Sequence, residues 1–389
     1  MTLDKKTRIE SNKSLKILVV AEISGPGSGT YTFLLRLLEI QTHLNIETSV
    51  LISKDQATGE VMSELRKFNV AVYVSFFNRA PFFCKPIFSL FFDLLYVLPF
   101  FIKCRPDLIH VTHGTPGIFN SLFVLPVSVL HTLHTIPTRK LRYGLPCFLK
   151  RMLIKKNKLF NTVSSYCRNA IIDCFGIEQR HVRVIYNSNK NNFDVSPSIR
   201  NGRSDKSLCI LTLGHVVDYK NPEGWLTVAT SIIAVRPHVM FIWAGEGKLL
   251  RHFASLVKDT NPPERIKFVG YRKDTKKLYQ DASIYFQPSI LENHSISVVD
   301  AMFFSLPCVV SDAGGLPESV LDGVTGYVCP KTEVKTYTER LLQLIDNPSN
   351  AIAMGKKGRE RAMQLFSQST QESKYLELYS ELTGTSFNV

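Results

Sequence analysis

The stretch from Phe286 to Val328 constrains the fold of this chain more than any other part of its 389 residues. An apolar run ends at Phe286, Pro288 breaks it, and a polar turn that carries Glu292 follows. From Ser295 to Met302 the apolar residues recur at helical spacing. A second apolar run, a glycine-rich turn and a short helix come next. The stretch therefore predicts a unit of strand, turn, helix and strand.

The start of the helix in this unit predicts a binding site. Asn293 or Ser295 can cap it, so its free N–H groups point at the turn that holds Glu292. Such a helix start attracts phosphate. Asp300 lies eight residues beyond Glu292 and falls along the flank of the helix. We therefore expect both acids to face one cleft.

The same stretch carries an ordered set of motifs that resembles a known family. Glycines that only shape the turns of an ordinary βαβ unit are the alternative, but the whole set within about 40 residues favours the family. The motifs are Glu292 to Asp300, Ala301-Met302, Gly314-Gly315-Leu316-Pro317-Glu318 and Asp322-Gly323-Val324-Thr325-Gly326. This set resembles the retaining glycosyltransferases of family 4, which have the GT-B fold; their second acid is usually Glu, whereas here it is Asp300.

The resemblance implies an α/β protein with the GT-B fold. Two Rossmann-like domains then place parallel sheets on either side of a cleft, and a C-terminal helix crosses back to the first domain. The length of the chain suffices for two domains. The expected acceptor-binding domain spans 1–190, a polar linker 191–207, the nucleotide-sugar-binding domain 208–366 and the returning helix 367–389.

The first domain begins with a strand, a glycine loop and a helix, which is typical of a mononucleotide-binding unit. The strand is expected at Leu15–Ala21, and the loop holds Gly25, Gly27 and Gly29. The resemblance implies that Gly27 and Gly29 let acceptor and donor phosphate approach the backbone. A tight turn that needs only flexibility is the alternative reading of each glycine.

Histidines follow two later strands of the first domain. His113 and His134 fall at expected carboxyl ends of parallel strands, where ligands bind. A single histidine can equally be a structural group. By position, His134 matches the family histidine that borders the reacting sugar, so we favour it over His110, His113 and His131.

In the second domain the resemblance implies a donor site. Lys220 matches the lysine that neutralises the donor diphosphate, but His215 stands where the family has arginine, and an imidazole is a weaker, pH-dependent phosphate donor. Tyr271 and Arg272 are expected to line the pocket of the base, with a surface turn as the alternative.

By the same resemblance, Glu292 contacts hydroxyls of the donor sugar and Asp300 the nucleotide ribose. No D-x-D motif occurs in the chain, so we expect no metal and no cofactor besides the nucleotide sugar. The expected catalytic residues are His134, Lys220 and Glu292. The expected donor-binding residues are Gly27, Gly29, His215, Lys220, Tyr271, Arg272, Glu292, Asn293, His294, Ser295, Ile296, Ser297 and Asp300.

The net charge of +14 lies almost entirely in the first half of the chain. Residues 1–195 hold 25 Lys and Arg against 13 Asp and Glu, and no acid occurs between Asp107 and Asp173. A solvated face is one reading of the basic segment Arg139–Lys158. Positive charge concentrated on one domain also suits an anionic lipid surface or a pyrophosphate-bearing acceptor. Nucleic acid ranks low because no recognition motif accompanies the charge.

The most apolar segment is Pro81–Lys103. Its core Ile87–Ile102 is shorter than the ~20 residues of a spanning helix and carries Asp93 at its centre, so we reject a transmembrane span. A helix packed on the sheet and a helix at the membrane interface remain open. The polar N-terminus and eight cysteines without a C-x-x-C pair indicate a cytoplasmic protein with reduced thiols. The apolar and basic segments indicate a peripheral position at the inner membrane face as a further expectation.

Together these observations predict a retaining, metal-independent glycosyltransferase. It would move a sugar from UDP or GDP to a saccharide acceptor, expected to be lipid-linked, in the synthesis of envelope polysaccharide such as lipopolysaccharide. A nucleotide-sugar epimerase on the same fold is the alternative enzyme. A non-catalytic relative that binds membrane or polyanion is the alternative outside enzymes.

Overall fold

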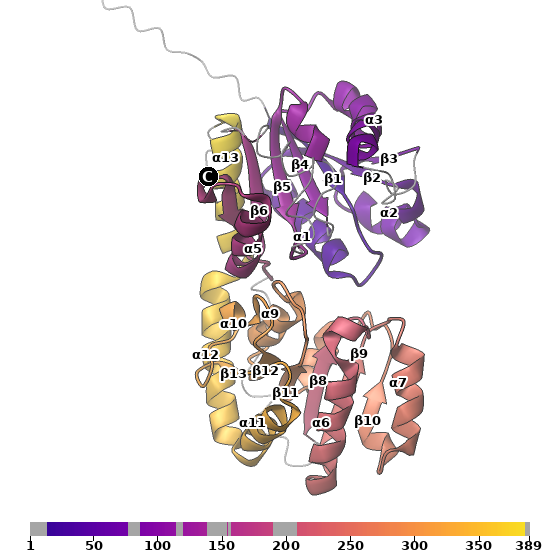
Figure 1. Ribbon diagram of the computed structural model, residues 1–389, viewed down its shortest axis with the longest axis vertical. Helices are drawn as coiled ribbons and strands as arrows, with labels where there is room; N and C mark the ends of the chain where they lie inside the picture. The colour runs from indigo at the N-terminus through magenta and orange to yellow at the C-terminus, as the bar shows by residue number, and fades with distance from the viewer. Residues whose placement is uncertain are drawn as a thin grey trace, which may run out of the picture.

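The computed structural model describes residues 14–76, 86–113, 120–137, 154, 157–189 and 208–385. The expected linker 191–207 lies outside these residues, as does most of the basic segment Arg139–Lys158. The described chain forms two sheets of parallel strands (Figure 1).

The first sheet has the strand order β3-β2-β1-β4-β5-β6-β7. Apolar runs form its central strands because a parallel sheet is buried on both faces. The register pairs Val19 with Val50 on one side and with His110 on the other. The strands are β1 (Lys16–Ala21), β2 (Glu47–Ile52), β3 (Ala71–Val74), β4 (Leu108–His113), β5 (Ser128–Leu133), β6 (Lys158–Thr162) and β7 (Val182–Val184). The helices are α1 (Gly29–His43), α2 (Gly59–Arg66), α3 (Pro86–Cys104) and α5 (Ser165–Phe175).

The second sheet has the order β10-β9-β8-β11-β12-β13. Two apolar clusters cover it, one of which centres on the buried indoles of Trp225 and Trp243. Its strands are β8 (Cys209–Leu213), β9 (Met240–Ala244), β10 (Ile266–Phe268), β11 (Ile284–Gln287), β12 (Cys308–Ser311) and β13 (Gly326–Cys329). Its helices are α6 (Pro222–Val235), α7 (Leu250–Leu256), α8 (Thr275–Asp281), α9 (Ile296–Phe303), α10 (Leu316–Ser319), α11 (Val334–Asp346) and α12 (Pro348–Leu365).

The last helix, α13 (Gln368–Thr383), returns to the first sheet (Figure 1). Its apolar residues Tyr375, Leu378, Tyr379 and Leu382 belong to the same buried cluster as the residues of α1 and β1. The hydroxyl of Tyr379 accepts a hydrogen bond from Gln41 at 2.9 Å, which fixes the helix in place. This arrangement confirms the predicted fold: two Rossmann-like domains with a C-terminal helix that crosses back.

The apolar helix α3 packs on the first sheet. Tyr96 and Val97 are buried in the cluster that covers β1 and β4, and Asp93 is also buried. Leu95, Leu98 and Ile102 face outward with exposed fractions of 38%, 37% and 62%. Among the described residues, no helix combines the length and apolarity that a membrane crossing requires.

Lys158 departs from the expectation for the basic segment Arg139–Lys158. Its side chain is buried, and its ammonium group donates hydrogen bonds to the carbonyls of Leu125 (2.7 Å) and Val127. Lys158 is the first residue of β6, and its buried ammonium group is not exposed to an anionic partner. Six cysteines lie in the described part of the chain, and none of them forms a disulfide.

Candidate active site

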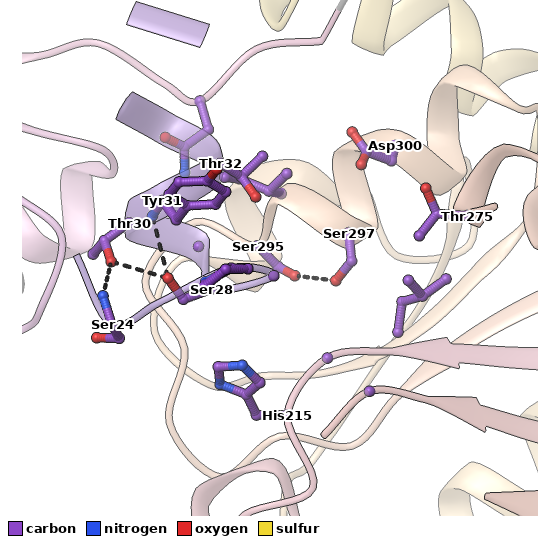
Figure 2. A pocket seen from close by; sticks show the side chains of 18 of the residues that line it. Ser24, Ser28, Thr30, Tyr31, Thr32, His215, Thr275, Ser295, Ser297 and Asp300 are labelled. Carbon is purple, nitrogen blue, oxygen red and sulfur yellow. Dashed lines mark hydrogen bonds between the residues drawn. The ribbon is translucent and has the colours of Figure 1, made fainter. Parts of the chain in front are cut away.

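A cavity of about 710 Å³ lies between the two domains. The first domain contributes the glycine loop and the start of α1, and the second contributes the loops that follow β8, β10 and β11 (Figure 2). Ligands bind at such carboxyl ends of parallel strands. All predicted site residues line this one cavity: Gly27, Gly29, His134, His215, Lys220, Tyr271, Arg272, Glu292, Asn293, His294, Ser295, Ile296, Ser297 and Asp300.

The start of α9 is capped and faces the cavity. The hydroxyl of Ser295 accepts from the Val298 amide at 3.4 Å and donates to Gln287 at 3.0 Å. The Ser297 hydroxyl lies 3.0 Å from that of Ser295 (Figure 2). The side-chain cap satisfies one of the free amides of the helix, and the others can bind an anion together with the helix dipole.

Beside this helix start, Lys220 and Glu292 form an ion pair. The ammonium group of Lys220 contacts Oε2 of Glu292, and the amide of Gln287 donates to the same oxygen at 2.8 Å. The exposed fractions of the two charged side chains are 12% and 15%. Within the described chain Oε1 of Glu292 accepts no hydrogen bond, so it can receive one from a ligand hydroxyl. The pair thus offers an acceptor for a sugar and a cation for an anion.

The turn Gly314–Gly315 packs directly on the backbone that carries Glu292. A Cβ atom at Gly314 would lie 1.8 Å from the carbonyl oxygen of Glu292, and one at Gly315 would lie 1.9 Å from that of Asn293. The Gly315 amide also donates to the Glu292 carbonyl at 3.3 Å. Gly314 has φ +57°, which favours glycine by itself. The double glycine is therefore required by close backbone approach.

Asn293 ties the site loop to the first domain. Its amide donates to the carbonyl of His134 at 3.1 Å, and its oxygen accepts from the hydroxyl of Ser164. The next residue, His294, has its carbonyl bound by Asn187 at 2.8 Å, and its ring is buried. Both residues hold the loop in place through contacts that no local pattern indicated.

His134 is half-buried, and its ring packs against Phe33 with centroids 4.2 Å apart. Burial lowers the pKa of His134 to about 3, so the imidazole is neutral near pH 7. Its Nε2 has no hydrogen-bond partner within the described chain. Since the ring is neutral and its Nε2 is buried, His134 does not provide a fixed cation at this end of the cavity.

The structure separates His134 from two of its rivals. His110 is buried and hydrogen-bonds Tyr379 at 2.9 Å and Thr132 at 2.8 Å, so it is structural. His131 is buried and stacks on Phe160 with centroids 5.5 Å apart. The side chain of His113 lies outside the described residues.

His215 also lines the cavity, and its pKa lies below the ordinary value because of burial first and of Lys220 second. It is therefore largely uncharged at neutral pH, whereas Lys220 provides a cation beside Glu292. Arg272 forms two hydrogen bonds with Asp274, at 2.8 and 2.6 Å. Its guanidinium is thus already paired at the rim of the cavity.

The two domains meet where Gly27 faces Tyr271. A Cβ atom at Gly27 would lie 2.8 Å from Cε2 of Tyr271, and Gly27 has φ +79°. A side chain at Gly27 would displace the exposed ring of Tyr271, and the left-handed φ by itself favours glycine here.

Sequence reasoning missed several residues that shape the site. Arg36 and Asn189 bind Asp300, as described below. Glu318 of the Gly-Gly-Leu-Pro-Glu motif accepts from the amides of Ser165 (2.8 Å) and Tyr166 (2.7 Å), so it caps α5 in the other domain. The motif had indicated Glu318, but its partners lie more than a hundred positions away in the chain.

Two family models match the chain, one for each domain. The model described as "Glycosyltransferase Family 4" matches residues 28–188. The model described as "Glycosyl transferases group 1" matches residues 198–361, which include every predicted site residue of the second domain.

Curated relatives resemble parts of the chain. A poly(ribitol-phosphate) alpha-N-acetylglucosaminyltransferase of Staphylococcus aureus is 25% identical over 43% of the chain and 35% of its own length. A UDP-Gal:alpha-D-GlcNAc-diphosphoundecaprenol alpha-1,3-galactosyltransferase of Escherichia coli is 23% identical over 46% of the chain and 47% of its own length. The chain thus spans less than half the length of these relatives.

Solved structures resemble the whole described fold. HepE of Anabaena in complex with UDP superposes with a TM-score of 0.77 at 19% identity, over 95% of this chain and 100% of that one. A TarM structure superposes with a TM-score of 0.71 at 14% identity, over 95% and 100% of the two chains. These likenesses show the fold.

Proposed function

The chain belongs to the glycosyltransferases of group 1 with the GT-B fold, and from this premise we propose that it transfers a sugar from a nucleotide-sugar donor to a saccharide acceptor. The ion pair of Lys220 and Glu292 at the start of α9 carries the proposal. The pair offers a cation beside a helix N-terminus, which suits a diphosphate, and a carboxylate, which suits sugar hydroxyls. HepE, a structural neighbour, has been solved with UDP-glucose, which favours UDP over GDP.

In the proposed reaction the bond between the anomeric carbon and the diphosphate oxygen breaks. The acceptor hydroxyl attacks from the same face, the configuration is retained, and the departing phosphate takes the acceptor proton. Lys220 and the α9 amides stabilise the charge that develops on the diphosphate. Metal independence is part of the proposal: the chain lacks a D-x-D motif, and Lys220 supplies a fixed cation.

We further propose a lipid-linked saccharide as the acceptor, in the synthesis of envelope polysaccharide. The E. coli relative is named for a diphosphoundecaprenol acceptor, and another relative is a Vi polysaccharide biosynthesis protein of Salmonella typhi. The basic first half of this chain suits such an anionic acceptor.

The proposal is tested with a panel of UDP- and GDP-sugars and a mixture of lipid-linked saccharides, analysed by mass spectrometry. We expect sugar transfer from one donor, at the same rate with and without EDTA. Strict dependence on a divalent metal would contradict the metal-independent scheme. A donor converted without any acceptor would instead indicate the epimerase, and the absence of nucleotide-sugar binding by calorimetry would indicate a non-catalytic relative.

Membrane association of the first domain is a separate proposal. The outward face of α3 exposes Leu95, Leu98 and Ile102, and the basic segment provides charge. We expect binding to vesicles with anionic lipid that weakens as salt rises. Replacing four basic residues by serine should reduce the affinity at least about tenfold. Lys158 is left unchanged because it is buried. The four replaced residues are Lys150, Arg151, Lys155 and Lys156.

The control variant removes the same number of charges from exposed positions of the second domain. It should bind the vesicles like the wild type. If both variants lose affinity equally, the effect is one of net charge, and the assignment to the first domain is wrong. The four control positions are Lys331, Lys335, Lys356 and Lys357.

A further inference from the structure

The carboxylate of Asp300 is held by residues from the first half of the chain. Asp300 lies on α9 of the second domain, whereas Arg36 lies on α1 of the first. Nη2 of Arg36 donates to Oδ1 of Asp300 at 3.0 Å, and the amide of Asn189 donates to the same oxygen at 2.5 Å. Both side chains of the ion pair are 18% exposed, so solvent screens the pair only in part.

The guanidinium of Arg36 is fixed at its other end. Nη1 donates to the carbonyl of Ser188, next to Asn189. The backbone of Asn189 in turn pairs with the segment that leads into α13. Its backbone N–H donates to the Phe366 carbonyl, and its backbone carbonyl accepts from the backbone N–H of Gln368, both at 3.0 Å. A planar guanidinium can bind two such acceptors at once, which a lysine cannot do with the same geometry. The orientation of Asp300 is therefore set by the first domain and the interdomain crossing.

One oxygen of Asp300 remains available to a ligand. Both hydrogen bonds go to Oδ1, while Oδ2 accepts none from the described residues. Asp300 lines the cavity four residues beyond the start of α9, which is about 6 Å along the helix. An ionised carboxylate only accepts hydrogen bonds, so it selects a ligand group that donates, such as a hydroxyl.

The electrostatics agree with this geometry. Burial raises the pKa of the Asp300 carboxyl above its ordinary value. The charge of Arg36 and the hydrogen bonds from Arg36 and Asn189 act against that rise. Arg36 therefore favours the ionised, accepting form of Asp300 at neutral pH.

We propose that Arg36 is a positioning residue through which the first domain aims Asp300 at a ribose hydroxyl of the donor nucleotide. This inference rests on the proposed nucleotide-sugar donor. It makes recognition of the ribose depend on both domains, because Asp300 belongs to the second domain and Arg36, which orients it, to the first.

The test compares ribonucleotides with their 2′,3′-dideoxy analogues by calorimetry on the full chain, with UDP and GDP. A hydrogen bond to a charged group predicts that the wild type binds the ribonucleotide roughly 10- to 100-fold more tightly than the analogue. Arg36→Met should reduce this ratio to about threefold or less, and Arg36→Lys should give an intermediate ratio. A purely structural role would lower both affinities without changing the ratio.

Arg272→Met is the matched control. Arg272 lines the same cavity, but its guanidinium binds Asp274 instead of Asp300. This variant should preserve the ratio whatever it does to the affinities. Asn189→Ser removes the other donor to Oδ1 of Asp300. It provides a second measurement of the ratio should Arg36→Met fold poorly. It should lower the ratio as well.

The outcomes separate this inference from the proposed function. If neither UDP nor GDP binds to the wild type, the nucleotide-sugar donor is wrong. If a ribonucleotide binds and its ratio to the analogue is unchanged in the Arg36 and Asn189 variants, the donor stands and the positioning role of Arg36 is refuted.

Discussion

Replacing Glu292 by glutamine or Lys220 by methionine will lower the rate of sugar transfer by roughly 10²–10³-fold each. The two charged groups share Oε2 as their point of contact beside the α9 start. In the proposed reaction, Lys220 offsets the charge that forms on the leaving diphosphate, and Glu292 offers its other oxygen to the donor sugar. The measurement is kcat/KM for the donor, with Tm recorded for each variant.

A double variant separates catalysis from stability. Lys220→Met alone leaves a carboxylate that is 15% exposed without its cation, and Glu292→Gln alone leaves an ammonium group that is 12% exposed without its anion. Each single change should therefore lower Tm. The combined variant carries neither charge, so it should regain part of the lost stability. Its activity should stay as low as that of the less active single variant, since the effects of removing groups that act together are not additive.

Two results would contradict the assignment of the pair. The first is a single variant that keeps activity within about tenfold of the wild type. The second is a double variant that regains activity together with stability, because the losses in the single variants would then come from misfolding.

Local sequence patterns predicted most of the sheet. The sequence predicts strands at Leu15–Ala21, Thr48–Ile52 and Leu108–Thr112, and these ranges differ from β1, β2 and β4 by one residue at an end. Parallel strands are buried on both faces, so their sequences are short apolar runs that stand out between polar turns. The loop from Glu292 to Ser297 was also predicted, because its polar turn and helix start are contiguous in the chain.

The contacts across the cavity could not be predicted. Arg36 lies on α1, but its partner Asp300 is 264 positions away along the chain. Lys158 sits in a run of basic residues that indicated a surface, yet the start of β6 turns its side chain inward to two carbonyl groups. Both outcomes depend on which strands and helices become neighbours. Spacing along the chain carries no information about that.

Replacing Gly315 by alanine will disrupt the site although this residue provides no side chain. The added Cβ would lie 1.9 Å from the Asn293 carbonyl and 2.9 Å from Cβ of Ser164. Ordinary contact needs more than 3 Å, so the site loop must move by over an ångström. We expect a destabilisation of about 1–3 kcal/mol from the overpacking. Because Asn293 and Glu292 move with the loop, we expect sugar transfer to fall about 10²-fold.

Gly59→Ala provides the control for this substitution. Gly59 begins α2, a Cβ atom there meets nothing within 4 Å, and its φ is not left-handed. The change should leave transfer intact and raise stability by about 0.4–1 kcal/mol through the unfolded chain. If Gly315→Ala kept both the Tm and the transfer rate of the wild type, the backbone at 292–293 could move without consequence. The double glycine would then not be needed to hold Glu292 in place.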